Sequence, residues 1–295
     1  MKNKLLTLAD KYETKDFLKE DPSQFLYYYK SVRDTELCAF TASLLSFGSR
    51  KQFIPKIRFI MENADNFGGI YKWITCGIYK KTFAPGDNKK FYRFYSYEDF
   101  NILFSRLEEI LDKEKTFGAF LKKEYYSEVK MHLAQGDNKC AQSGAVFKDK
   151  RRAQSDSDFK STVRAQSSAD LLSTVRAGSN TVFLVDVLSQ IFTGCSIVPS
   201  TKSSAKKRLC MFLRWMVRDN SPVDLGLWSW YSKSDLIIPL DVHVLEEAKK
   251  LKLISDNAGA TRKTAELLSQ KAKKYFPDDP CRLDFALFGL GVDKE

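Results

Sequence analysis

A lysine and an aspartate, each at the start of a predicted helix, are residue types that could act together on an electrophilic carbon. The stretch SSAKKRLCMFLRWMVR predicts a helix with Ser204 as its cap and Lys207 in its first turn. The helix dipole and the cations Lys206 and Arg208 disfavour a further positive charge there, so the amine of Lys207 is suited to attack and to form a Schiff base. In IIPLDVHV, Asp241 comes two residues after Pro239 and is predicted to cap the helix VHVLEEAKKLKL. A carboxylate held in this way could stabilise a positive charge.

Both residues also have simpler interpretations. Alone, Lys207 would be a surface or phosphate-contacting lysine, and Asp241 would be a helix cap without chemistry. Lys206 is a rival for the nucleophile, because one residue of helix turns a side chain by about 100°. His243, two residues after the aspartate, is expected to support the site structurally rather than to act as a general base.

The two stretches together resemble the helix-hairpin-helix DNA glycosylase superfamily, in which a lysine opens the helix after the hairpin and an aspartate follows later in the chain. The archaeal 8-oxoguanine glycosylases are the most similar branch, and we expect this chain to represent a bacterial branch. The resemblance covers residues 181–250, and ASLLSFGSR at 42–50 supports it, because the superfamily places a lesion-probing loop after a similar helix. The sequence departs from the superfamily at the hairpin, where VPSTKSSA replaces the usual glycine-rich turn.

This resemblance implies a DNA base-excision glycosylase, with AP-lyase activity, that removes an oxidised base such as 8-oxoguanine. Lys207 would attack the sugar C1′, and Asp241 would stabilise the positive charge that develops on the deoxyribose. The extruded base would enter a pocket for which the candidate residues are Phe47, Trp73 and Asp284. Each has a structural alternative: the two rings could be core residues, and the aspartate could anchor the closing helix.

Two other classes of function stay open at this stage. A non-catalytic helix-hairpin-helix DNA-binding protein would keep the two helices, and it would not need Lys207 and Asp241 to converge on one pocket. A binder of RNA is the third possibility. No cofactor is expected, and no metal, because the six cysteines lack the spacing of a zinc ribbon or an iron–sulfur cluster.

The charge of the chain favours a nucleic-acid partner. There are 48 Lys and Arg residues against 37 Asp and Glu, a net charge of +11, and residues 201–274 hold 15 of the basic and 8 of the acidic residues. We expect a monomer that binds double-stranded DNA with a damaged base. The candidate contacts to the DNA backbone are Lys202, Ser203, Lys206, Arg208, Arg214 and Arg218.

Apolar residues at helical spacing predict an all-α fold of two helical lobes with a low-complexity insertion. Residues 1–133 form the N-terminal helical part, 181–295 form the helix-hairpin-helix and C-terminal part, and the two make one catalytic unit. Between them, 134–180 repeats RAQS and STVRA with few large apolar residues, so we expect it to be disordered or loosely helical. The stretch KKFYRFYSY at 89–97 mixes basic and aromatic residues, which suits nucleic-acid contact or a half-buried strand or helix rim.

The composition also bears on where the protein works. No stretch approaches the ~18 apolar residues of a membrane span, and the N-terminus lacks the long apolar core of a signal peptide. We therefore expect a cytoplasmic protein with reduced cysteines, located at the bacterial nucleoid and without membrane contact.

Overall fold

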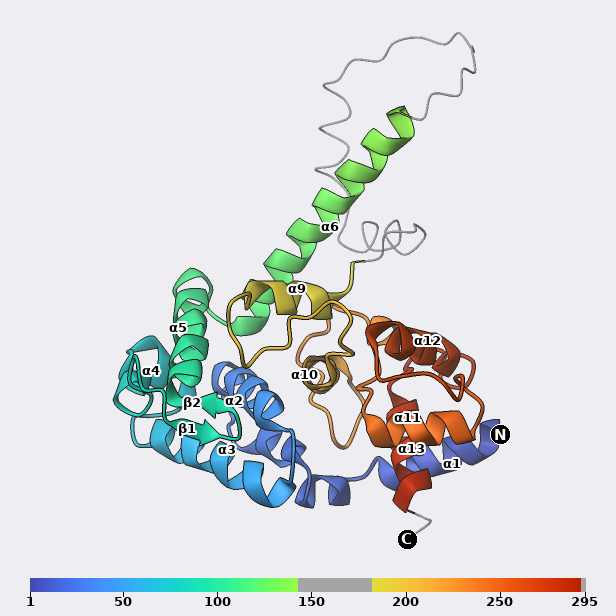
Figure 1. The fold of residues 1–295 in the computed structure, drawn as a ribbon, viewed down its shortest axis with the longest axis horizontal. Coiled ribbons are helices and arrows are strands. Elements are labelled where there is room, and N and C mark those ends of the chain that lie inside the picture. Colours follow the sequence, from blue (N-terminus) through green and yellow to red (C-terminus); the bar gives the residue numbers. More distant parts are fainter. Residues whose placement is uncertain (143–181, 293–295) are drawn as a thin grey trace. The chain divides into compact units, whose positions relative to one another are not determined.

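The computed structural model describes residues 1–142 and 182–292. The chain divides into two compact units, one made of Met1–Phe120 and Leu188–Glu295 and the other of Leu121–Val187. The described residues are mostly α-helical, with a single two-stranded sheet among them, so the predicted all-α class is confirmed (Figure 1). Within the same residues, no helix combines the length and the apolar sequence needed to cross a bilayer.

Most of the helices belong to the first unit, and the boundaries between the two units fall within α6 and α9 (Figure 1). The elements of the N-terminal half are α1 (Lys2–Tyr12), η1 (Lys15–Lys19), η2 (Pro22–Tyr27), α2 (Val32–Leu45), α3 (Arg50–Asp65), α4 (Ile70–Thr75), η3 (Ile78–Lys81), β1 (Lys90–Tyr92), β2 (Tyr95–Ser96), α5 (Tyr97–Lys113) and α6 (Phe117–Gln142). Those of the C-terminal half are α9 (Leu184–Ile191), α10 (Lys207–Val217), η4 (Lys233–Asp235), α11 (Val242–Lys250), α12 (Arg262–Ala272) and α13 (Arg282–Val292).

The segment predicted to be a disordered or loosely helical insertion, 134–180, begins inside a regular helix. α6 continues to Gln142, so the first nine residues of that segment are helical. Residues 143–180 lie outside the described residues.

Two helices from opposite halves of the chain form the core of the first unit. Every residue of α2 from Thr35 to Leu45 is buried, and α10 packs against it. The ring of Phe40 in α2 lies 5.0 Å from the rings of Phe117 and Phe192 and 5.1 Å from that of Phe212 in α10. Aromatic rings at such distances add to the burial free energy, so α10 is held firmly in place.

The helices nearest the two ends of the chain, α1 and α13, pack side by side (Figure 1). A side chain at Gly289 of α13 would clash with the ring of Tyr12 in α1, so the close approach of the two helices depends on glycine here. α11 packs on α13 as well. The C-terminal helix is therefore fixed from two sides.

The start of α10 differs from the prediction. Ser204 does not cap the helix; its hydroxyl accepts a hydrogen bond of 3.2 Å from the N–H of Lys206, which itself occupies the N-cap position with a left-handed φ of 49°. Lys207 is therefore the first helical residue. From Leu209 to Val217 every residue of α10 is buried, so this helix has no polar outer face.

Candidate functional site

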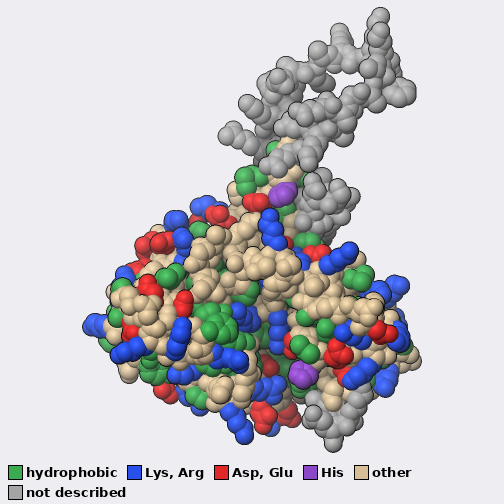
Figure 2. Space-filling view, viewed as in Figure 1, with side chains coloured by type: hydrophobic (Ala, Val, Ile, Leu, Met, Phe, Trp, Pro, Cys, Tyr) green, Lys and Arg blue, Asp and Glu red, His purple; other side chains and the backbone are tan. Residues whose placement is uncertain are grey.

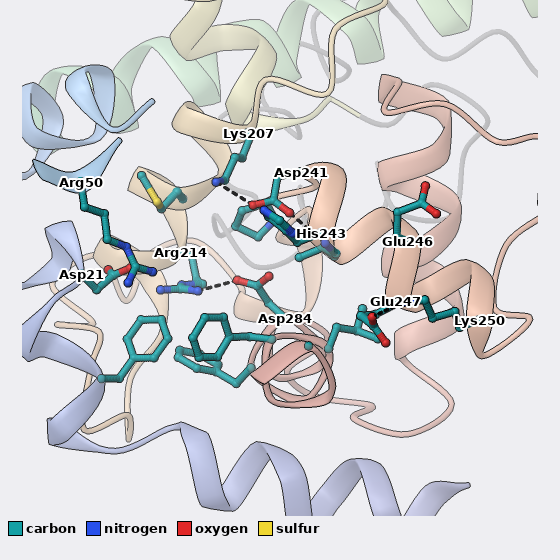
Figure 3. A pocket seen from close by; sticks show the side chains of 18 residues that line it. Asp21, Arg50, Lys207, Arg214, Asp241, His243, Glu246, Glu247, Lys250 and Asp284 are labelled. Carbon is teal, nitrogen blue, oxygen red and sulfur yellow. Dashed lines mark hydrogen bonds and ion pairs between the residues drawn. The ribbon is translucent and has the colours of Figure 1, made fainter. Parts of the chain in front are cut away.

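A cavity of about 550 Å³ lies among α10, α11, α13 and the segment that follows α1 (Figure 3). Its lining includes side chains of the segments 17–21, 207–214, 239–250 and 284–291, together with Arg50 at the start of α3. All of these residues belong to the first unit. The volume falls in the range of about 300–1,000 Å³ that is typical of sites for small molecules.

Lys207 and Asp241 point toward each other in this cavity (Figure 3). The Nζ of Lys207 lies 2.8 Å from Oδ2 of Asp241. The other carboxylate oxygen, Oδ1, accepts a hydrogen bond of 2.8 Å from the backbone N–H of Val244, so Asp241 caps α11 as the sequence predicted. Their side chains remain 38% and 28% exposed, which leaves both groups accessible to a ligand.

Asp241 is kept ionised by its surroundings. Burial alone would raise the pKa of this carboxyl, but the charge and hydrogen bond of Lys207, the N–H of Val244 and the nearby His243 together hold the pKa below its ordinary value. A carboxylate of this kind is a weak base, and it is suited to stabilising positive charge. His243 is exposed and lines the cavity as well.

A second pair of opposite charges lies in the wall of the cavity (Figure 3). The Nη1 of Arg214 lies 2.7 Å from Oδ2 of Asp284 in α13, and the Nε of the same arginine lies 3.4 Å from Asp224. Burial raises the pKa of Asp284 to about 6 even though Arg214 pulls in the opposite direction. This carboxyl can therefore exchange a proton close to neutral pH, unlike Asp241.

Several cavity residues were not singled out from the sequence. Met211 follows Lys207 by four residues and Phe288 follows Asp284 by four, so helical spacing could have indicated that each pair shares a face. Phe17 also lines the cavity, on η1, and no local pattern pointed to it.

The two aromatic candidates for a base pocket do not line the cavity. Trp73 is fully buried, with its ring 5.0 Å from that of Phe104, so it is a core residue and the predicted contact with a base is wrong. Phe47 is half-buried in a cluster of rings, 5.0 Å from Tyr92 and 5.5 Å from Tyr95, and does not reach the cavity. Of the three candidates, only Asp284 faces this space.

Arg214 of α10 and Arg218, the C-cap residue of that helix, were expected at DNA phosphates, and both are buried in ion pairs. The side chain of Arg218 is 2% exposed; it lies 2.6 Å from Glu13 and 2.9 Å from Asp279, and it also binds Asp224. The side chain of Arg214 is 3% exposed. Their prediction as phosphate contacts is wrong, because their helix face turns inward toward carboxylates that come from distant parts of the chain.

The other four backbone candidates have different positions. Lys206 is only 5% exposed, so it is not a surface cation, and it does not line the cavity. Arg208 is half-buried and is already bound: it donates hydrogen bonds to the carbonyl of Leu44 at the end of α2 and, at 3.1 Å, to the hydroxyl of Tyr95. Both depart from the expected phosphate contact. Lys202 and Ser203 are exposed, before α10, and remain candidates.

Nothing in the described parts of the chain suggests a metal centre, since no three His, Cys, Asp or Glu side chains there gather as metal ligands would. Comparison with curated proteins and with solved structures found no match. A family model does match residues 21–293, a range that includes Lys207, Arg214, Asp241 and Asp284. The chain belongs to the family described as "Protein of unknown function (DUF2400)".

Proposed function

We propose that this protein is a DNA base-excision glycosylase with AP-lyase activity, with the helix-hairpin-helix glycosylase type of fold, and that Lys207 is its nucleophile. The observation that carries the proposal is the 2.8 Å approach of Lys207 and Asp241 in one accessible cavity. A DNA-binding module without chemistry has no need for this convergence. The two residues are 34 positions apart, at the starts of α10 and α11, and only the tertiary fold brings them together.

The pair suits the cleavage of an N-glycosidic bond. The amine of Lys207 attacks C1′ of the deoxyribose, the bond from C1′ to the base breaks, and its electron pair leaves with the base. The amine loses one proton as it becomes a secondary amine, and the departing base takes up one proton. Asp241 stays ionised throughout and stabilises the positive charge on the sugar. Opening of the sugar ring then yields the Schiff base.

Lys207 must give up the proton of its ammonium before it attacks. At rest the ammonium is held by Asp241, whose lowered pKa makes it a poor acceptor of that proton. When the sugar enters, its contact with Asp241 loosens the ion pair, and the ammonium releases its proton to solvent. Positive charge develops on the sugar only afterwards, as the bond to the base breaks, and it then takes the place of the ammonium beside the carboxylate. Exchange of one cation for another beside Asp241 is thus the central event of the mechanism.

The wall of the cavity offers groups for an extruded base. Arg214 supplies N–H donors, and Asp284 supplies acceptor oxygens or, when protonated, a donor. Met211 and Phe288 add apolar surface. 8-Oxoguanine, the leading substrate on the resemblance of the sequence, has both N–H and C=O groups on its edges and could bind to such a pair. The site of action would be double-stranded DNA in the cytoplasm, at the nucleoid, with the protein acting as a monomer.

Borohydride trapping tests the proposal. Wild-type protein incubated with duplexes that each carry one damaged base should form a covalent adduct when borohydride reduces the imine, and Lys207→Gln should form none. The affinity of this variant for DNA should fall by less than about tenfold, because only one cation is lost. Lys252→Gln, which removes an exposed lysine that pairs with Asp256 and does not line the cavity, is the matched control and should trap normally.

Two results would change the assignment. Equal trapping by Lys207→Gln together with loss of trapping by Lys206→Gln would transfer the nucleophile to Lys206. Tight binding of damaged duplexes by the wild type without release of any base and without an adduct would favour the non-catalytic DNA-binding protein.

A further inference from the structure

The turn of the β1–β2 hairpin holds an aromatic ring out in solvent. The strands pair antiparallel, with Tyr92 opposite Tyr95, so Arg93 and Phe94 form the turn. Arg93 has a left-handed φ of 53°, a conformation that residues other than glycine seldom adopt. Phe94 is 59% exposed. A strained turn thus presents this ring at its tip.

Neighbouring rings give Phe94 a rigid base. We refer to Phe47, Tyr92, Phe94 and Tyr95 as the aromatic platform. The ring of Phe94 lies 5.4 Å from that of Phe47, at an interplanar angle of 35°, and 4.5 Å from that of Tyr95. The hydroxyl of Tyr92 donates a hydrogen bond to the carbonyl of Phe47, which joins the hairpin to the loop after α2. The exposed ring is therefore preorganised rather than free to fold back.

Cations surround the aromatic platform. Residues 89–95 contain three Lys or Arg residues and no acid. The guanidinium groups of Arg208 and Arg93 lie 4.8 Å and 5.7 Å from the centre of the Phe47 ring. On the face drawn in Figure 2, hydrophobic side chains with Lys and Arg beside them gather over the region where Figure 1 draws this hairpin. A ring to stack on and cations beside it match a nucleobase with its phosphate.

The chain connects the aromatic platform to the cavity at two points. Arg208, which contacts Phe47 and Tyr95, directly follows Lys207 in α10. Arg50, which lines the cavity, lies only three residues after Phe47. Both links keep the aromatic platform close to the cavity into which a base would be extruded. DNA bound at the cavity would therefore pass over the platform as well.

We infer that the aromatic platform, through Phe94, stacks on the base that is left unpaired in the complementary strand when its partner is extruded into the cavity. This inference rests on the proposed function. Extrusion of a nucleotide leaves the opposite base without a pair, and a stacking ring replaces part of the lost contact whatever the identity of that base. The platform would thus lower the cost of holding the duplex open.

One exposed phenylalanine on a surface is not unusual in itself. Phe67, after α3, is 38% exposed and has Lys81 5.8 Å from its ring centre, so it has the same pairing of ring and cation. It is connected neither to Lys207 nor to the lining of the cavity. Phe67→Ala is therefore a matched control for the loss of an exposed ring.

The experiment compares two duplexes in binding to the full-length protein. One carries a tetrahydrofuran abasic analogue opposite 2-aminopurine, and the other carries the analogue on both strands, so that it has no base to stack. Phe94→Ala should bind the first duplex about tenfold more weakly, equivalent to ~1.4 kcal/mol, and the second as well as the wild type does. Phe94→Trp should bind both like the wild type, and Phe67→Ala should change neither. Thermal melts check that each variant folds.

The outcomes separate this inference from the proposed function. Equal loss on both duplexes, or loss on neither, overturns the stacking of Phe94 on the opposite base. If the wild type traps an imine while Phe94→Ala binds normally, the inference fails and the glycosylase stands. If binding depends on Phe94 as described but no imine is ever trapped, the glycosylase fails and the inference stands. A wild type that does not prefer the abasic duplex to an intact one overturns both.

Discussion

Replacement of Asp241 by Asn separates the two roles that the structure gives to this residue. Asn retains an oxygen that can accept the hydrogen bond from Val244, so most of the cap of α11, about 1 kcal/mol, is kept. The negative charge facing Lys207 is lost. Both side chains are partly exposed, so the ion pair contributes no more than about 1 kcal/mol after solvent screening. Asp241→Asn should therefore lower Tm by only about 2–4 °C.

Activity should respond far more strongly than stability. Removal of a group that stabilises charge in a transition state typically costs about 10²–10³-fold in rate, so base release by Asp241→Asn should fall by that factor. Single-turnover release of base from a damaged duplex measures the rate, and a thermal melt measures stability. Asp219→Asn is the matched control: its carboxylate pairs with Lys233 away from the cavity, and this change should leave the rate unaltered.

The pH dependence of stability gives a further check on Asp241. Because its pKa is lower in the folded protein than in the unfolded chain, its ionisation stabilises the fold above about pH 4, and this contribution is lost as the pH falls through the folded-state pKa. The difference in Tm between wild type and Asp241→Asn should therefore shrink in acid. A fall in Tm of more than about 10 °C at neutral pH, in step with the loss of activity, would show that the carboxylate is mainly structural and would refute the reasoning.

Two further substitutions test the buried charges. Arg218→Met removes one partner of a buried ion network, so it should lower the free energy of unfolding in urea by about 3–5 kcal/mol. Lys202→Ala, at an exposed position, should have almost no effect on it. If Arg218→Met is as stable as the wild type but binds DNA more weakly, the prediction of Arg218 as a phosphate contact would be correct after all. The pKa of Asp284 is about 6 in the folded protein, above its value in the unfolded chain. The protonated carboxyl therefore stabilises the fold below about pH 4, and this contribution is lost as the pH rises through 6. Asp284→Asn has no carboxyl to titrate, so the Tm of the variant minus that of the wild type should be higher at pH 7.5 than at pH 4.5. The same difference at both pH values would show that the carboxyl does not titrate in this range.

Local sequence patterns predicted the local structure around the site well. The all-α class follows from apolar residues at helical spacing, and the cap at Asp241 follows from an extended run that ends in a proline and an aspartate. Such features depend on a few neighbouring residues. The same kind of reasoning placed the start of α10 incorrectly, because it assigned the cap to Ser204 and did not foresee a left-handed Lys206.

Properties that depend on distant partners were not predictable in this way. Arg218 looks like a surface cation in the sequence, yet its carboxylate partners Glu13 and Asp279 lie 205 and 61 residues away. Trp73 has no local mark that distinguishes a core ring from a stacking ring, and the aromatic residues around it decide the matter. The approach of Lys207 to Asp241 was expected only because of the resemblance to a family, since neither residue indicates the other.

The structure of α10 explains why its charged residues were misjudged as a group. Lys207, Met211, Arg214 and Arg218 recur at intervals of four, three and four and so lie along one stripe of the helix. Exposure falls along this stripe, from 38% for the side chain of Lys207 to 3% for Arg214 and 2% for Arg218. Periodicity identifies the stripe but cannot reveal this gradient, because the gradient is set by α13 and the segment after α1. One row of a single helix therefore supplies the partly exposed amine of Lys207 and the guanidinium of Arg214 to the lining of the cavity, and the buried ion pairs of Arg218 beyond it. Asp224 pairs with both Arg214 and Arg218. A substitution of Arg218 would therefore also alter the ion pairing of Arg214 in the wall of the cavity.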